Sequence, residues 1–130
     1  MFLNVLDIDE RGAFAELAEK MIQADGIEIG RETAALAALK AEMGISGAVA
    51  TDRSLGDLAA VFGSKRSKIA ALLELIGLGY SDTSFHVGEE SLVTTVSQEM
   101  GIAGEEVAQV EGWVKDHVDL VRRALVLMRD

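Results

Sequence analysis

The chain has no cysteine and no proline, and each absence removes a class of structure. Without cysteine there are no disulfides, no thiolate metal sites and no cysteine nucleophiles. Without proline no ring clash interrupts a helix, so the 13 glycines must supply the breaks between elements. Aromatic residues are also scarce, at 5% of a chain that is 49% hydrophobic. The core must therefore be built from Ala, Leu, Val, Ile and Met, a composition that favours helices.

Long apolar runs are missing as well. The most hydrophobic stretch, residues 69–80, is too short to cross a bilayer and contains Glu74. Residues 1–12 lack the basic segment of a signal peptide and turn acidic by Asp7. We therefore expect a cytoplasmic protein without a membrane span. Its 130 residues are enough for one domain with a single core, so residues 1–130 are expected to form one domain.

Positive charge is in short supply. The chain has 12 basic and 22 acidic residues, a net charge of −10. The excess is even, because residues 1–65 and residues 66–130 each contain 6 basic and 11 acidic residues. Such a field repels phosphate backbones, so nucleic acid is not an expected partner. It attracts cations or a basic partner, or serves solubility alone.

Apolar residues recur three and four positions apart, with polar or glycine-containing breaks between the runs, which is the pattern of amphipathic helices. The expected helices are residues 10–24, 31–43, 54–62, 65–80, 91–100 and 105–128. No segment has the alternation of a strand. The sequence therefore predicts an all-α fold, a compact bundle of five to seven helices.

Particular residues are expected to begin, cross or line these helices. Asp9 is expected to cap the first helix and Ser64 the fourth. Gly77 and Gly79 lower helix propensity in the most apolar helix, so another helix is expected to cross closely there. The last helix, roughly 35 Å long at 1.5 Å per residue, has one broad apolar face. That face comprises Val107, Val110, Val114, His117, Val121, Leu125 and Met128, with Trp113 and Leu120 beside it.

The chain partly repeats itself at an offset of 57 residues. The tetrapeptide Glu-Met-Gly-Ile occurs at residues 42–45 and again at residues 99–102. In the same frame Glu32 falls on Glu89 and Asp25 on Asp82. Each half has a helix, an Asp-containing break, a helix headed by Glu and the tetrapeptide. We expect two related helix–corner–helix units, at about residues 9–45 and 66–102.

Acidic residues gather at both breaks. The first break has Asp25, Glu28 and Glu32, and the second has Asp82 and Glu89. Carboxylates with loop carbonyls suit Ca²⁺ or Mg²⁺, although neither break is an EF-hand loop. His86 and Glu90 also lie at the second break, and an imidazole favours a transition metal such as Zn²⁺. The alternative is purely structural, with Asp as cap and Glu near the positive end of the following helix.

Two segments resemble a known family. "AFAELAEKMIQADGIEIGRE" resembles the A-x-x-ADG-x-x-x-x-x-E signature of TerB-like domains, the tellurite-resistance family, and "LLELIGLGYSDTSFHVGEE" is similar to its second copy. The resemblance implies an all-helical fold of two related halves and a divalent-cation site formed by acidic residues at the corners. It also implies a role in stress or tellurite resistance. The second corner reads Ser81-Asp82-Thr83 and lacks the glycine of the first.

No catalytic signature is present. The sequence has no nucleophile elbow, no phosphate-binding glycine loop and no nucleophile–base pair that can be named, so an enzyme is not expected. Glu74 is expected to point outward, to join a structural pair or to contribute to a site with Asp82; His117 is expected to pack at the core edge. Trp113 is expected in the core or on a partner-facing surface.

Two functions remain open. The first is a non-enzymatic TerB-like domain that binds Ca²⁺ or Mg²⁺, ahead of Zn²⁺, through Asp25, Glu28, Glu32, Asp82 and Glu89. The second is a metal-free protein–protein interaction module. In that case the acidic surface and the long last helix would serve an unknown protein partner or a homodimer.

Overall fold

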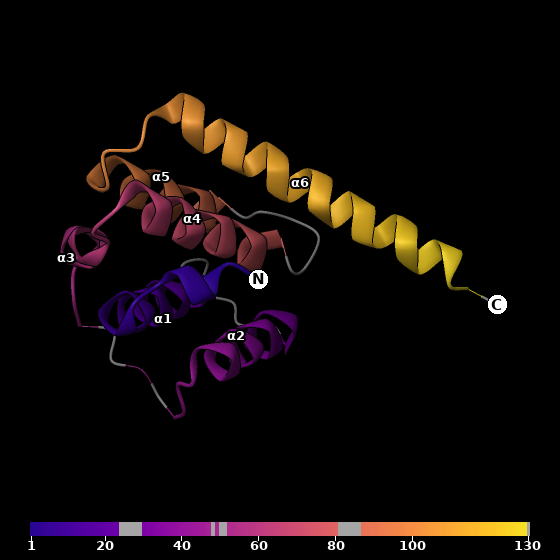
Figure 1. The fold of residues 1–130 in the computed structure, drawn as a ribbon, viewed down its shortest axis with the longest axis horizontal. Helices are drawn as coiled ribbons and strands as arrows, with labels where there is room; N and C mark the ends of the chain where they lie inside the picture. Colours follow the sequence, from indigo (N-terminus) through magenta and orange to yellow (C-terminus); the bar gives the residue numbers. More distant parts are fainter. Residues whose placement is uncertain (24–29, 48, 50–51, 81–86, 130) are drawn as a thin grey trace.

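The computed structural model describes residues 1–23, 30–47, 49, 52–80 and 87–129, with only the backbone described at residues 30–33 and 87–88. Within these ranges the chain forms one short 3₁₀ helix and six α-helices, and no strand (Figure 1). The elements are η1 (Leu3–Val5), α1 (Ile8–Gln23), α2 (Gly30–Met43), α3 (Leu55–Val61), α4 (Lys65–Gly79), α5 (Val87–Glu99) and α6 (Gly104–Leu127). The predicted all-α bundle of five to seven helices is confirmed.

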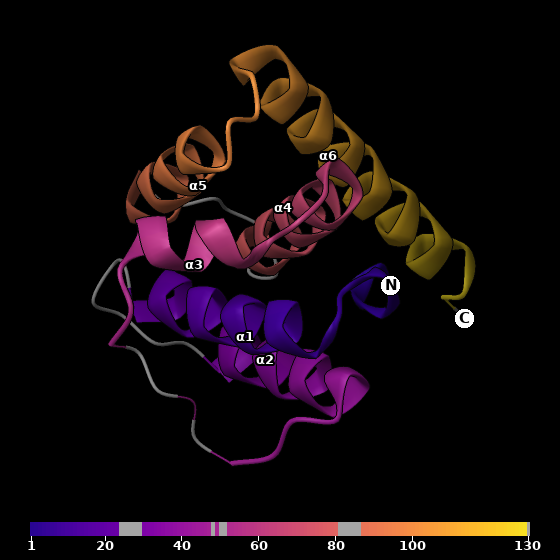
Figure 2. The same cartoon turned by 60° about the vertical axis from the view of Figure 1, so that its left-hand side comes forward.

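Helices α1 and α4 form the centre of the bundle. Helix α1 contacts α2, α3, α4 and α5, while α4 contacts α1, α2, α5 and α6 (Figure 2). Their inward faces are buried and mainly apolar, with the fully buried Phe14 and Leu17 on α1 and Leu72 and Leu75 on α4. The scarcity of aromatic residues thus results in a core of small and branched side chains, in which Phe14 is the largest fully buried member.

Helix α6 is the longest element and lies along one side of the bundle. It packs on α4 and α5, and its C-terminal half extends beyond the other helices (Figure 1). Length explains this projection. Helix α6 has 24 residues and α4 has 15, so at 1.5 Å per residue α6 is about 13 Å longer than the helix it packs on.

Helix starts follow from capping residues, with one correction. Ser64 caps α4 as predicted, and Ser67 three residues later completes a capping box with it. The prediction of Asp9 as cap of α1 is wrong, because Asp7 has that role. The Asp7 Oδ1 accepts from the Glu10 amide at 2.8 Å, and Glu10 Oε1 accepts from the Asp7 amide at 2.9 Å. This reciprocal pair is a capping box that begins two residues earlier than expected.

The repeated tetrapeptide forms the same structure in both places. Gly44 and Gly101 have φ of 75° and 74°, in the left-handed region that favours glycine. The amides of Ile45 and Ile102 each donate to the carbonyl five residues earlier at 2.9 Å. The two glycine amides donate three residues back, at 3.1 Å and 3.0 Å. Both are Schellman caps that end α2 and α5; that the two halves arose from one duplicated unit stays a prediction.

The predicted close helix crossing is wrong at Gly77, and at Gly79 it stays a prediction. A Cβ atom built on Gly77 would meet no heavy atom within 4 Å, so no neighbouring helix depends on its small size. Gly77 instead borders a cavity that opens between α2, α4 and α6.

Candidate functional site

The predicted cation-site residues are only partly covered by the structure. Asp25, Glu28 and Asp82 lie outside the described residues. Glu32 is the third residue of α2, with its side chain also outside the description. Glu89 is the third residue of α5, so these two glutamates have equivalent places in their helices. The side chain of Glu89 is nearly buried, at 1% exposure.

No metal centre is assembled by the side chains that the structure describes. Among them no group of three or more His, Asp or Glu residues comes close enough to hold an ion. The predicted cation site at the two corners therefore stays a prediction. Among the described residues the candidate site is a cavity.

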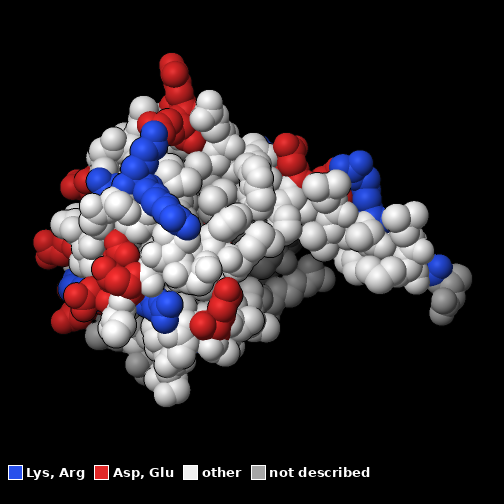
Figure 3. Space-filling model, in the orientation of Figure 1, with Lys and Arg blue, Asp and Glu red and all other residues white. Residues whose placement is uncertain are grey.

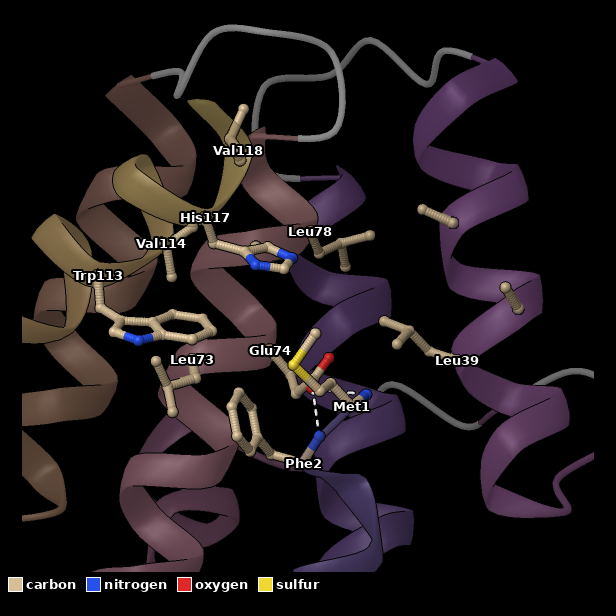
Figure 4. Close-up of a pocket in the computed structure, with 13 residues that line it drawn as sticks. Met1, Phe2, Leu39, Leu73, Glu74, Leu78, Trp113, Val114, His117 and Val118 are labelled. Carbon is tan, nitrogen blue, oxygen red and sulfur yellow. Dashed lines mark hydrogen bonds and ion pairs between the residues drawn. The ribbon is translucent and has the colours of Figure 1, made fainter. Parts of the chain in front are cut away.

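A cavity of about 360 Å³ opens between α2, α4, α6 and the first two residues (Figure 4). Its walls are almost wholly apolar. The lining residues are Met1, Phe2, Ala35, Ala38, Leu39, Leu73, Glu74, Gly77, Leu78, Trp113, Val114, His117 and Val118. Because Gly77 and two alanines contribute little side chain, three helices surround the space without filling it.

Among the described lining residues the one carboxylate, Glu74, is held by the N-terminal residues. Glu74 Oε1 accepts from the Phe2 amide at 2.8 Å and lies 3.1 Å from the Met1 ammonium (Figure 4). The same ammonium lies 3.2 Å from Glu42 Oε1 on α2. Glu74 thus joins a structural pair, one of the roles expected for it, and its carboxylate fixes η1 against α4 rather than facing into an open catalytic cleft.

Three rings, two from α6 and one from Phe2, pack in a row along one side of the cavity. Trp113 packs edge-to-face on Phe2, with ring centroids 5.5 Å apart and planes at 66°. On its other side Trp113 stacks on His117, at 5.2 Å and 6°. Trp113 remains exposed and His117 is half-buried, which places both at the cavity rim. The predictions of a packed core-edge His117 and a Trp113 on an accessible surface agree with this arrangement.

The apolar face of α6 continues past the cavity into solvent. Val110 and Val114 are buried against the bundle. About two to four turns beyond Val114, the same face presents Val121, Leu125 and Met128, which are 45%, 56% and 69% exposed. Leu120 and Leu127 beside them are also exposed. Figure 3 shows this projecting end as largely uncharged surface with few charged side chains.

Charge changes sign along α6. Residues 104–119 contain five acidic residues and one lysine, whereas residues 120–129 contain three arginines and no acidic residue. The projecting end is therefore a basic, apolar surface on a protein of net charge −10. The sequence predicted the apolar face of this helix but not that part of it is exposed. One signal of the exposure was available, because the apolar pattern of the last helix is longer than any other expected helix that could cover it.

Comparison with known proteins identifies no relative. No protein-family model matches the sequence. No curated protein and no solved structure matches it either. Membership of the TerB-like family therefore stays a prediction. Among the described helices none combines the length and the apolar character needed to span a bilayer.

Proposed function

We propose that this protein is a non-enzymatic interaction module that binds a helical partner along the exposed face of α6. The supporting observation is the continuous apolar stripe from Val114 through Val121 and Leu125 to Met128, buried at one end and exposed at the other. Exposed apolar surface of this kind, flanked by charged residues, marks interaction sites on proteins that otherwise keep such side chains inside.

The chemistry of the stripe suits a helix better than an extended peptide. Its members are spaced three and four residues apart, which is the arrangement read by an amphipathic helix lying in a groove. The exposed Trp113 and the cavity beside it would provide an anchor that becomes buried when the partner binds, as such interfaces use. Burial gives roughly 25 cal/mol per Å² of apolar surface removed from water, so these side chains together supply a useful driving force.

Two adjacent residues provide a matched test. Leu125 and Val126 are equally exposed, at 56% and 54%, but only Leu125 lies four and three residues from Val121 and Met128 and so shares their face. The immobilised wild-type protein should retain partner proteins from an extract of the source cells. These partner proteins should be lost with immobilised Leu125→Glu and kept with immobilised Val126→Glu. Mass spectrometry of the retained proteins, with self-association counted, measures this. Identical retention by both variants and the wild type would refute the proposal.

The second candidate function is the divalent-cation site at the Asp25 and Asp82 corners. Support comes from Glu89, whose carboxylate is almost fully buried in the first turn of α5. Acidic side chains are rarely buried to this extent unless a hydrogen bond or a cation compensates. With Asp82 nearby in sequence, Glu89 would contribute one of the several oxygen ligands that Ca²⁺ or Mg²⁺ requires.

A melting experiment tests this second function. An ion that binds only the native state at 100 times its Kd adds about 2.7 kcal/mol of stability, so the melting temperature should rise by several degrees. Ca²⁺, Mg²⁺, Mn²⁺ and Zn²⁺ are each added to chelator-treated protein, and Asp25→Asn should abolish the rise. Asp9→Asn, an exposed acid elsewhere, is the control. The cation function is wrong if no ion raises the melting temperature or if Asp25→Asn responds like the wild type.

A further inference from the structure

We infer that the partner of the α6 face is a second copy of this chain, bound so that the two α6 helices run antiparallel. This inference rests on the proposed function and adds the identity and orientation of the occupant. A symmetric dimer uses one self-complementary patch twice, and α6 has the required self-complementarity in both its charge and its apolar pattern.

The charge pattern specifies the orientation. Residues 104–119 have a net charge of −4 and residues 120–129 a net charge of +3, counting one lysine against five acids and three arginines against none. In an antiparallel pair centred on Val121, residues 113–119 of each helix, which include Asp116 and Asp119, lie against the basic end of the other, and Asp119 faces Arg123. A parallel pair would place the three arginines of each chain beside those of its partner, which like-charge repulsion disfavours.

The apolar pattern specifies where the helices cross. The exposed apolar side chains of α6 lie between Trp113 and Met128, and Val121 is near the midpoint of that range. With the two-fold axis at Val121, Leu125 of each chain faces His117 of the other, and Met128 reaches the level of Trp113, which is exposed. These two positions on the receiving chain line the cavity. Each projecting end would then cover the mouth of its partner's cavity, so the two exposed apolar features of the chain bury each other.

The geometry also favours closure over endless assembly. The projecting end of α6 and the cavity lie next to each other on the same face of the helix. In a two-fold dimer the projecting end of each chain can therefore cover the cavity of the other, which closes the assembly at two chains. The body of the protein, with most of the acidic excess, provides a complementary field for the basic end of the arriving helix. No other basic and apolar element of comparable length occurs among the described residues.

The oligomeric state is the first test. Light scattering and sedimentation across a concentration series should report a dimer for the wild type. Leu125→Glu should weaken the dimer about 100-fold or more, because a buried anchor becomes an unpaired charge at two symmetric places. Val126→Glu carries the same charge change on another face and should remain dimeric. Circular dichroism of both variants confirms that the monomer keeps its helices.

Single introduced cysteines test the orientation, since the chain has no cysteine of its own. Val121→Cys should form a disulfide with its own copy, and Val126→Cys should not. A mixture of His117→Cys and Leu125→Cys should yield mainly the mixed disulfide if the helices are antiparallel. Disulfides of each variant with itself alone would indicate parallel helices and overturn the inference.

The two proposals fail in different ways. A wild-type protein that is monomeric at every concentration, while Leu125→Glu still abolishes retention of some other protein, overturns the dimer and leaves the interaction module standing. A dimer that Leu125→Glu does not weaken overturns the inference, because the chains then pair through another surface. A wild-type protein that is monomeric and that retains no protein in a way that Leu125→Glu abolishes refutes both the dimer and the interaction module.

Discussion

Replacing Phe14 by alanine should lower the free energy of unfolding by about 3–5 kcal/mol, the range for truncating a buried aromatic side chain. Phe14 is completely buried on α1, the helix that contacts four others. Phe14 is the largest of the fully buried side chains, so its truncation removes more buried volume than any other single substitution by alanine at those positions. Urea unfolding followed by circular dichroism measures the loss, as a lower midpoint with an unchanged slope.

Ile8 provides the control for this prediction. It is a large apolar residue on the same helix, yet its side chain is 84% exposed. Ile8→Ala should therefore change the free energy of unfolding by less than about 0.5 kcal/mol, as surface substitutions usually do. Equal effects of Phe14→Ala and Ile8→Ala would mean that α1 is not the centre of the core.

Local features of the fold were predictable from the sequence because they depend on few residues. Ser64, predicted to cap the fourth helix, accepts from the Ser67 amide at 3.1 Å, and Ser54 begins α3 in the same way by accepting from the Asp57 amide at 3.1 Å. The Glu-Met-Gly-Ile repeat ends two helices in the same way for the same reason. The Asp9 error shows the limit. Both Asp7 and Asp9 are capping residues by type, and only the position of Glu10 three residues after Asp7 distinguishes them.

Features that depend on the arrangement of helices were not predictable in this way. A glycine in a helix is compatible with a close crossing or with an unfilled space, and only the placement of α2 and α6 decides that Gly77 borders a cavity. Likewise the pattern of α6 is the same along its length, but Val114 is covered and Val121 is not, because α4 ends first. The spacing of apolar residues shows which face of a helix could be buried, but it does not show whether a neighbouring helix covers that face.

The candidate site divides along the same line. The acidic corners were identified by residue type, but Asp25, Glu28 and Asp82 lie outside the described residues. Cation binding at these corners is therefore tested by the melting experiment and not by the structure. The surface formed by Trp113, Leu125 and Met128 was visible in the sequence only as a helix face. Its meaning as an interaction surface comes from its exposure beside the cavity.

Replacing Glu10 by glutamine should lower the free energy of unfolding at neutral pH by about 3 kcal/mol. The Glu10 carboxylate is buried and joins three segments. It accepts from the Asp7 amide at 2.9 Å and from the Gly63 amide at 3.0 Å, and the Ser67 side chain beside it also lowers its pKa. A glutamine amide has one acceptor oxygen, so a buried donor would lose its partner, which costs about 1–3 kcal/mol, and the bonds to a charged acceptor would weaken. Asp9→Asn, in the same helical turn but exposed, should have little effect.

The loss of unfolding free energy caused by Glu10→Gln should also depend on pH. The direction of that dependence follows from the shift in the pKa of Glu10. Burial alone would raise the pKa of Glu10, but the hydrogen bonds from Asp7, Ser67 and Gly63 outweigh it and hold the pKa below its ordinary value of 4.5. A lowered pKa means that the contribution of the carboxylate is fully present above pH 4.5 and is lost as the pH falls through the lower, folded-state pKa. The difference between wild type and Glu10→Gln should therefore be constant near neutral pH and shrink below pH 4.5. Urea unfolding at a series of pH values measures it, and a difference that instead grew on acidification would mean that the native state does not favour the charged form of Glu10.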